Sequence, residues 1–202
     1  MAEYRYYIIH KPYGVLSQFT REHPDHRVLG DLSDFPKDVY PVGRLDKDSE
    51  GLLIITNDRS LTHQLLAPQF AHTRTYWVQV EGEPPPEAIK QLRNGVDIRI
   101  KKQTYKTHPA QVKRIPAPPS LPDRDPPVRF RKTVPDSWLS IQLTEGKNRQ
   151  VRRMCAAVGY PVLRLVRTRI EDLNLQVLNI KTGEAKELSR EKIYPLLNIK
   201  LK

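Results

Sequence analysis

Ionisable side chains are concentrated in residues 41–58, and most of them precede the apolar segment 52–56. Four acidic and two basic residues fall within these eighteen positions, and one of the acids is Asp46. Such a composition is also ordinary for a solvated turn. However, residues 52–56 are apolar or β-branched and predict a short buried strand, which would hold the Asp46 carboxylate in place. A positioned carboxylate can act as a nucleophile or as a general acid or base.

The neighbouring elements explain how this loop would be held. Asn57 or Asp58 is placed to cap a helix, and residues 4–10 predict a first strand that ends at Lys-Pro-Tyr-Gly in 11–14. Residues 17–40 predict a polar surface excursion. The helix would carry three leucines on one side: Leu61, Leu65 and Leu66.

Charge indicates the class of partner. The 202 residues include 34 Lys and Arg against 23 Asp and Glu, which gives a net charge of +11. This balance favours a polyanion such as nucleic acid, although a basic soluble protein without such a partner has the same composition. We find no apolar run of 18 residues and no secretory signal, and we expect no membrane partner. The single cysteine, Cys155, cannot form an internal disulfide, which fits the cytoplasm.

Later segments alternate between strand and helix patterns. Residues 74–81 place Tyr76, Val78 and Val80 on one strand face, and residues 138–143 form a second alternating strand. Further expected elements are a helix over 87–95, a helix over 149–158, a strand over 173–178 and a last helix from Ser189 to about 197.

The expected helix over 149–158 has an apolar stripe of Val151, Met154, Cys155 and Val158. Cys155 is therefore expected to be a buried packing residue. Arg149 and Arg153 lie opposite the stripe. Arg152 lies at about 100° from Val151, on the edge between the two faces, where a half-buried guanidinium is expected.

Residues 101–136 contain eight of the eighteen prolines and nine Lys or Arg residues. Proline disfavours regular helix and central strand, so we expect an extended basic arm inserted into the domain. A disordered linker is the alternative, because proline-rich stretches often have that property.

Several motifs resemble one enzyme family. Gly-Arg-Leu-Asp at 43–46, followed by Glu-Gly-Leu-Leu at 50–53 and Thr-Asn-Asp at 56–58, closely resembles the catalytic motif of the RNA pseudouridine synthases, in the RsuA-type branch that modifies ribosomal RNA. Residues 146–153 resemble the family's Gly-Arg-x-x-Gln-apolar-basic motif, with Lys147 at the usual arginine. Segments of similarity cover 7–14, 41–58, 74–82, 124–143 and 145–167.

The resemblance implies an α+β fold. A twisted, largely antiparallel sheet would carry helices and loops, in one catalytic domain over residues 1–202 with two lobes around a basic cleft. Only about ten residues precede Lys11, so we expect the S4-type RNA-binding domain of many members to be absent. No metal and no other cofactor is expected, because isomerising uridine involves no redox change.

The resemblance also implies roles for single residues. Asp46 would be the nucleophile, and Arg152 would keep it ionised, since a nearby arginine lowers a carboxyl pKa by roughly 1–3 units. Tyr76 would stack on the uracil and serve in proton transfer at C5. Arg44 would hold the target nucleotide out of its helix, and Val151 would pack under the base. Five further basic residues are expected to bind RNA: Lys147, Arg149, Arg153, Arg129 and Arg131.

Two other functions remain open from the sequence. The first is a non-catalytic RNA-binding or ribosome-assembly factor with the same fold. The second is a nucleoside hydrolase or glycosidase, with Asp48 or Glu50 as a second catalytic carboxylate. The tail of the arm, 124–138, resembles the insertion of a member that acts on large-subunit ribosomal RNA, so this RNA is the expected substrate of what we expect to be a cytoplasmic monomer.

Overall fold

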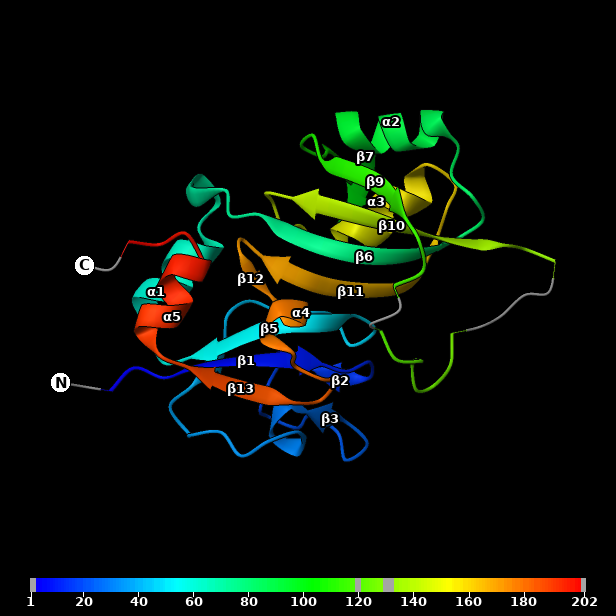
Figure 1. Cartoon of the computed structure of the whole chain (residues 1–202). Helices are drawn as coiled ribbons and strands as arrows, with labels where there is room; N and C mark the ends of the chain where they lie inside the picture. The colour runs from blue at the N-terminus through cyan, green and yellow to red at the C-terminus, as the bar shows by residue number, and fades with distance from the viewer. Residues whose placement is uncertain (1–2, 119–120, 129–132, 201–202) are drawn as a thin grey trace. The chain divides into compact units, whose positions relative to one another are not determined.

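Mostly antiparallel strands and a few short helices make up both parts of this chain in the computed structural model (Figure 1). The structure describes residues 3–118, 121–128 and 133–200. The chain divides into unit 1, residues 1–72 with 167–202, and unit 2, residues 73–166. Arg129 and Arg131, two of the expected RNA-binding residues, lie outside the described residues.

Unit 1 is built on the strand order β13-β1-β5, to which the last residues of β11 belong. Strand β1 pairs antiparallel with β13 and with β5, and β4 pairs antiparallel with the end of β5. The elements of unit 1 are β1 Tyr6–Lys11, β2 Val15–Leu16, β3 Arg27–Val28, the 3-10 turn Leu29–Asp31, β4 Tyr40–Pro41, β5 Glu50–Thr56, α1 Arg59–Leu66, the 3-10 turn Pro68–Phe70, β12 Leu173–Asn174, α4 Leu175–Leu178, β13 Ala185–Leu188 and α5 Arg190–Leu196.

Both faces of the β1–β5 pair are buried. Leu52 and Ile54 belong to one apolar cluster together with residues of α1 and α5, and Figure 1 shows these two helices together on one side of the strands. Leu53 and Ile55 belong to a second cluster that includes Leu45. Strand β5 is therefore fixed from both sides, and the loop that precedes it starts from a rigid base.

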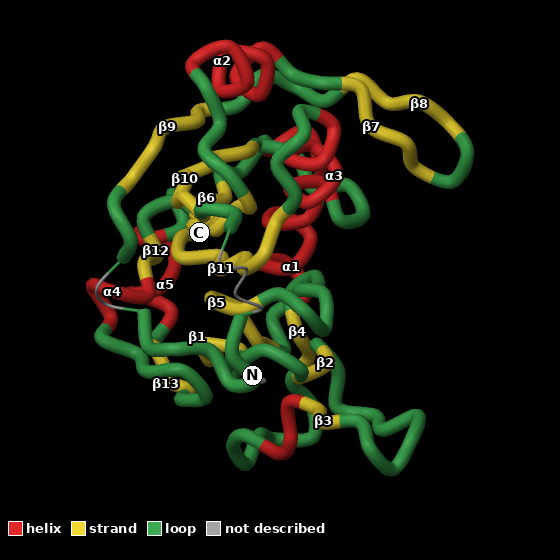
Figure 2. Tube along the Cα trace, turned by 90° about the vertical axis from the view of Figure 1, so that its right-hand side faces the viewer, coloured by secondary structure: helices red, strands yellow, loops and turns green. Residues whose placement is uncertain are grey.

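Unit 2 is built on the antiparallel strand order β6-β10-β9. A separate hairpin of β7 and β8 extends away from these strands (Figure 2). The elements are β6 Arg74–Glu81, α2 Pro86–Asn94, β7 Asp97–Ile100, β8 Gln103–Lys106, β9 Gln111–Ile115, β10 Asp136–Leu143, α3 Gln150–Ala157 and the first residues of β11, which spans Val162–Ile170. One apolar cluster contains Val78, Leu139 and Met154 and joins the strands to α3.

Most expected elements are confirmed within one or two residues, and four expectations are wrong. Residues 17–40 are not only a polar surface excursion, because Leu29 and Val39 are buried in the cluster that includes Leu45. Residues 173–178 form two strand residues followed by the short helix α4, because the Asn174 side chain accepts a hydrogen bond from the backbone of Gln176 and caps a helix. Part of the expected arm is regular, since β8 and β9 lie between 103 and 115. Leu66 is 48% exposed and does not share the buried side of α1.

Candidate active site

The loop that carries Asp46 connects β4 to β5 in unit 1. Asp46 is half-buried between the buried residues Leu45 and Ser49. Residues 46–49 form a turn, because the backbone N–H of Ser49 donates to the carbonyl of Asp46 at 3.0 Å. The backbone that carries this carboxylate is therefore a closed turn with a buried residue on each side, as a positioned carboxylate requires.

A residue from the preceding loop fixes the backbone before Asp46. Ser17 Oγ donates to the carbonyl oxygen of Leu45 at 2.8 Å and accepts from the Leu45 N–H at 3.0 Å. The N–H of Gly14 donates to the carbonyl of Lys47 at 2.8 Å on the other side. Residues 45–47 are thus held at both ends by the segment that follows β1.

Lys11 is a fully buried lysine at the end of β1. Its ammonium group donates to the carbonyl oxygens of Pro12 at 3.0 Å and Val15 at 2.7 Å. Burial lowers the pKa of Lys11 to about 8, against the opposing attraction of carboxylates that include Glu50 and Asp46. A positively charged group therefore lies inside the protein close to the acidic loop that carries Asp46.

The structure explains why the Glu-Gly-Leu-Leu motif has a glycine at residue 51. Its φ is +110°, and a Cβ built there would lie 2.2 Å from the carbonyl oxygen of Arg167. The buried Arg167 side chain also donates from Nε to the carbonyl of Leu52 at 2.8 Å. Strand β11 can approach β5 this closely only because residue 51 has no side chain.

Arg44 is exposed in the same loop, and its guanidinium donates to Gln18 Oε1 at 3.0 Å. This contact links the loop of Asp46 to the segment that contains Gln18.

Tyr76 and Val151 are associated with the same apolar cluster of unit 2. Tyr76 lies in β6, is half-buried, and packs against the apolar cluster that contains Val151 of α3. Arg152 follows on the same helix and is half-buried, as its place at the edge of the stripe predicted. Its Nη1 donates to the carbonyl of Val162 at 3.3 Å.

Glu145 organises the segment that leads into α3. Its carboxylate accepts from the Tyr105 hydroxyl at 2.5 Å, from the His108 N–H at 2.8 Å and from the Gln150 amide at 2.5 Å. Burial alone would raise the Glu145 pKa, but these hydrogen bonds lower it below its usual range. The Gln150 amide oxygen in turn accepts from the Lys147 N–H at 2.8 Å, which sets the turn before the helix.

The other basic residues expected to bind RNA differ in their surroundings. Arg149 and Lys147 are exposed, and the Lys147 ammonium lies 4.7 Å from the centre of the Tyr105 ring. Arg149 precedes α3 with a positive φ of 49°, so the helix begins one residue later than expected. The Arg153 guanidinium donates from Nε to the carbonyl of Asn148 and from Nη1 to the carbonyl of Arg99, so two backbone contacts hold it in place.

Cys155 is fully buried, and burial raises the pKa of its thiol to about 12. A thiol with that pKa is a packing group, as the stripe predicted, because only the thiolate is a good nucleophile.

Sequence patterns alone did not identify Lys11, Ser17, Arg167 and Glu145 as residues that hold the candidate site. Lys11 has a weak signal in the Lys-Pro-Tyr-Gly that follows a strand. Ser17 has none, because its partner Leu45 is 28 residues away.

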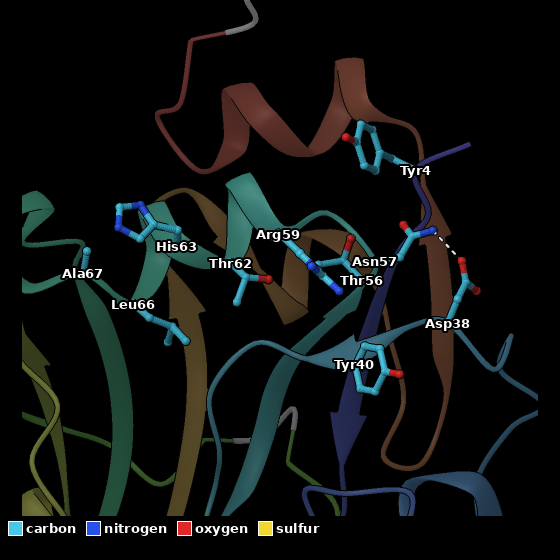
Figure 3. Close-up of a pocket in the computed structure, with 10 residues that line it drawn as sticks. All are labelled: Tyr4, Asp38, Tyr40, Thr56, Asn57, Arg59, Thr62, His63, Leu66 and Ala67. Carbon is cyan, nitrogen blue, oxygen red and sulfur yellow. Dashed lines mark hydrogen bonds between the residues drawn. The ribbon is translucent and has the colours of Figure 1, made fainter. Parts of the chain in front are cut away.

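Unit 1 also contains a pocket of about 760 Å³ at the far end of β5 (Figure 3). Thr56, Asn57 and Arg59 line it together with the exposed ring of Tyr40. Since Thr56 is six residues after Glu50 along an extended strand, the pocket lies about 20 Å from the start of β5. It contains none of the residues expected in the active site.

Within the described residues, no group of three or more His, Cys, Asp or Glu side chains is arranged to hold a metal ion. In the same part of the chain, no helix has the length and apolar character needed to cross a membrane.

Comparison with known proteins agrees with these motifs. The chain is 54% identical to ribosomal large subunit pseudouridine synthase E of Xanthomonas axonopodis pv. citri over 85% of this chain and 88% of the relative. It is 47% identical to the protein of the same name from Vibrio vulnificus, over 94% of this chain and 77% of the relative. A crystal structure of a pseudouridylate synthase matches 97% of this chain and 75% of its own, with a TM-score of 0.76 and 25% identity, which supports the α+β fold with a largely antiparallel sheet. The family described as RNA pseudouridylate synthase matches residues 5–157, and the chain therefore belongs to this family.

Proposed function

We propose that this enzyme isomerises a specific uridine of large-subunit ribosomal RNA to pseudouridine. The observation that carries the proposal is Asp46, which stands in the Gly-Arg-Leu-Asp turn and is held by hydrogen bonds on both sides. The names of the relatives at 54% and 47% identity supply the choice of large-subunit RNA.

The distribution of charge supports an RNA substrate. Unit 2 contains 18 Lys and Arg residues against 8 Asp and Glu, whereas unit 1 contains 16 against 15. Ten of the eleven net positive charges therefore belong to residues 73–166, the unit that also contains Tyr76 and α3. Phosphate contacts of this basic surface would offset the few kcal/mol needed to take a uridine out of its stack.

The reaction rearranges bonds within one nucleotide. The bond from the sugar C1′ to the uracil N1 breaks, a bond from C1′ to C5 forms, and the proton on C5 is lost while N1 gains one, so no oxidant or reductant is consumed. We assign Asp46 as the nucleophile in this exchange, on the sugar or on the base, and Tyr76 to stacking on the uracil and to proton transfer at C5.

Arg152 completes the proposed set as the cation that keeps Asp46 ionised, with Arg44 holding the extruded nucleotide and Val151 packing under the base. Lys147, Arg149 and Arg153 would contact the RNA backbone, as would Arg129 and Arg131 in the arm.

We further propose that the enzyme works in the cytoplasm as a monomer and without a cofactor. The single cysteine is buried and free, which suits a reducing compartment.

A direct assay tests the function. Unmodified large-subunit RNA is incubated with the protein, and pseudouridine is mapped by nucleotide. We expect new pseudouridine at a single site with the parent, none with Asp46→Asn, and strongly reduced formation with Tyr76→Phe. Circular dichroism checks that each variant is folded.

The assay separates the alternatives. A non-catalytic RNA-binding factor would retain RNA and form no pseudouridine, and a nucleoside hydrolase would release free uracil. Glu50, at 2% exposure, is poorly accessible as the second carboxylate of a hydrolase, whereas Asp48 is half-buried like Asp46, so the assay decides between these functions.

A further inference from the structure

The hairpin of β7 and β8 is closed firmly at its base. The Val96 N–H donates to Thr107 Oγ1 at 2.9 Å, and the Thr107 N–H donates to the Val96 carbonyl at 3.0 Å. Gly95, with a φ of +85°, brings its backbone against the carbonyl of Thr107 where no side chain would fit. The two ends of the hairpin are therefore held together at a fixed point of unit 2.

One face of the hairpin is packed against the apolar cluster of unit 2. Ile98 is 2% exposed and belongs to the apolar cluster of this unit, and Ile100 and Tyr105 pack against that cluster. The Tyr105 hydroxyl is also held by Glu145. With this face buried and hydrogen-bonded, the hairpin is a rigid projection and not a free loop.

The opposite face and the tip are polar and basic. Arg99, Lys106, Lys101 and Lys102 are all exposed, and Asp97 is the one acidic residue of the hairpin, opposite Lys106 in the strand pairing. Neither Lys101 nor Lys102 makes a hydrogen bond or ion pair with any residue that the structure describes. These ammonium groups are available to a ligand.

The turn itself is unfavourable for lysine. Lys101 and Lys102 have positive φ values of 45° and 69°. A two-residue hairpin turn of this kind is normally made by Asn-Gly, because glycine and asparagine tolerate the left-handed region best. The hairpin therefore has two lysines in a turn conformation that costs backbone energy.

We propose that the β7–β8 hairpin is an RNA-binding finger, in which Lys101 and Lys102 contact phosphate groups of the substrate outside the target nucleotide. The proposal rests on RNA being the substrate, as argued above. Its support is the location of the two lysines in the unit with ten net positive charges and at the end of a rigid projection.

The finger is joined to the segment that begins α3. Glu145 binds Tyr105 of the hairpin and Gln150 of the helix, and the Lys147 ammonium lies over the Tyr105 ring. Arg153 of α3 donates to the carbonyl of Arg99 in β7. These contacts fix the hairpin relative to α3, the helix that carries Arg152. Phosphates bound at the hairpin tip are therefore held at a fixed position relative to this helix.

The sharpest test removes both charges while improving the turn. Lys101→Asn with Lys102→Gly installs the preferred Asn-Gly pair, so we expect the melting temperature to stay the same or rise by about 2–4 °C. Affinity for a large-subunit RNA fragment should fall about tenfold at physiological salt. The slope of log K against log salt should become less steep by about 1.5–2, since two phosphate contacts are lost.

The matched control removes two charges elsewhere. Lys181→Asn with Lys192→Gln takes two exposed lysines from unit 1 and should leave affinity and salt slope at the parent values. An unchanged affinity of the hairpin variant overturns the proposal, and so does an equal loss in the control, which would indicate a general charge effect. Lys101→Gln with Lys102→Gln, which keeps two long side chains, should reproduce the loss.

Pseudouridine formation distinguishes this proposal from the proposed function. With saturating RNA the hairpin variant should keep the parental kcat, while the KM for RNA rises. A parent protein that binds RNA but makes no pseudouridine would refute the proposed function alone, and the binding measurements would still decide the hairpin.

Discussion

Ser17 and Leu45 exchange two hydrogen bonds through one hydroxyl group, which accepts from the Leu45 N–H and donates to the Leu45 carbonyl. These two hydrogen bonds join the loop that contains Ser17 to the loop that contains Asp46, and they fix the residue immediately before Asp46. The position of the proposed nucleophile therefore depends on a serine that is itself buried.

Ser17→Ala is expected to lower kcat by about 10- to 100-fold, because a displacement of about 1 Å at a reacting group has effects of this size. The KM for RNA should change little, since no RNA-binding group is removed. Steady-state kinetics with an RNA fragment gives the two constants. Ser60→Ala, at an exposed position of α1, is the matched control and should behave as the parent; parental kcat for Ser17→Ala would remove its positioning role.

Gly51→Ala is expected to destabilise the protein by about 3 kcal/mol or more, because the new Cβ would overlap the Arg167 carbonyl at 2.2 Å in addition to the strain of a positive φ. Chemical denaturation measures the free energy of unfolding. Gly183→Ala isolates the strain alone, since its φ is +88° and its added Cβ would meet nothing within 4 Å. We expect a loss of about 1 kcal/mol there. Equal losses at both positions would contradict the close approach of the strands.

Asp58 is the buried acceptor for three elements of unit 1. Its carboxylate accepts from Tyr6 of β1 at 2.8 Å, from Tyr194 of α5 at 2.6 Å and from the Leu61 N–H of α1 at 3.0 Å. Asp58→Ala leaves these donors buried without their acceptor and should destabilise the protein by about 3 kcal/mol or more.

The pH dependence of this cluster has a definite sign. Burial alone would raise the Asp58 pKa, but the hydrogen bonds from Tyr194, Leu61 and Tyr6 lower it below 3.8. The stabilisation is therefore present above pH 4 and is lost as the pH falls through the folded-state pKa. Tyr194→Phe should show a smaller loss of about 1–2 kcal/mol, and Asp34→Ala, at an exposed position, almost none. A parental unfolding energy for Asp58→Ala would exclude this role.

Lys11 predicts a trend of the same sign at alkaline pH. Its pKa falls from 10.5 to about 8 on folding, because burial disfavours the charged amine. Between these values the unfolded chain binds more protons than the folded protein, so the contribution of Lys11 to stability rises with pH. Relative to Lys11→Met, the parent should gain about 2 kcal/mol between about pH 7.5 and 9.5. Denaturation of both proteins at each pH measures the difference, and a constant difference would show that the Lys11 pKa is not lowered.

The sequence by itself determined the strands β6 and β10, because the alternation of Val78 and Val80 with polar neighbours, and of Leu139 and Ile141, has a period of two that only a strand satisfies. It also determined the apolar stripe of α3 and the buried state of Cys155. The motif around Asp46 and the excess of Lys and Arg were sufficient to indicate the family and an RNA partner.

The tertiary structure decided what holds those residues. Ser17 reaches Leu45, Tyr105 reaches Glu145 and Gly51 meets Arg167 across 28, 40 and more than 100 positions of the chain. Periodicity reports only which side of its own element a residue occupies. A hydrogen bond or backbone contact between distant residues depends on how separate elements pack, and local pattern contains no information about that packing.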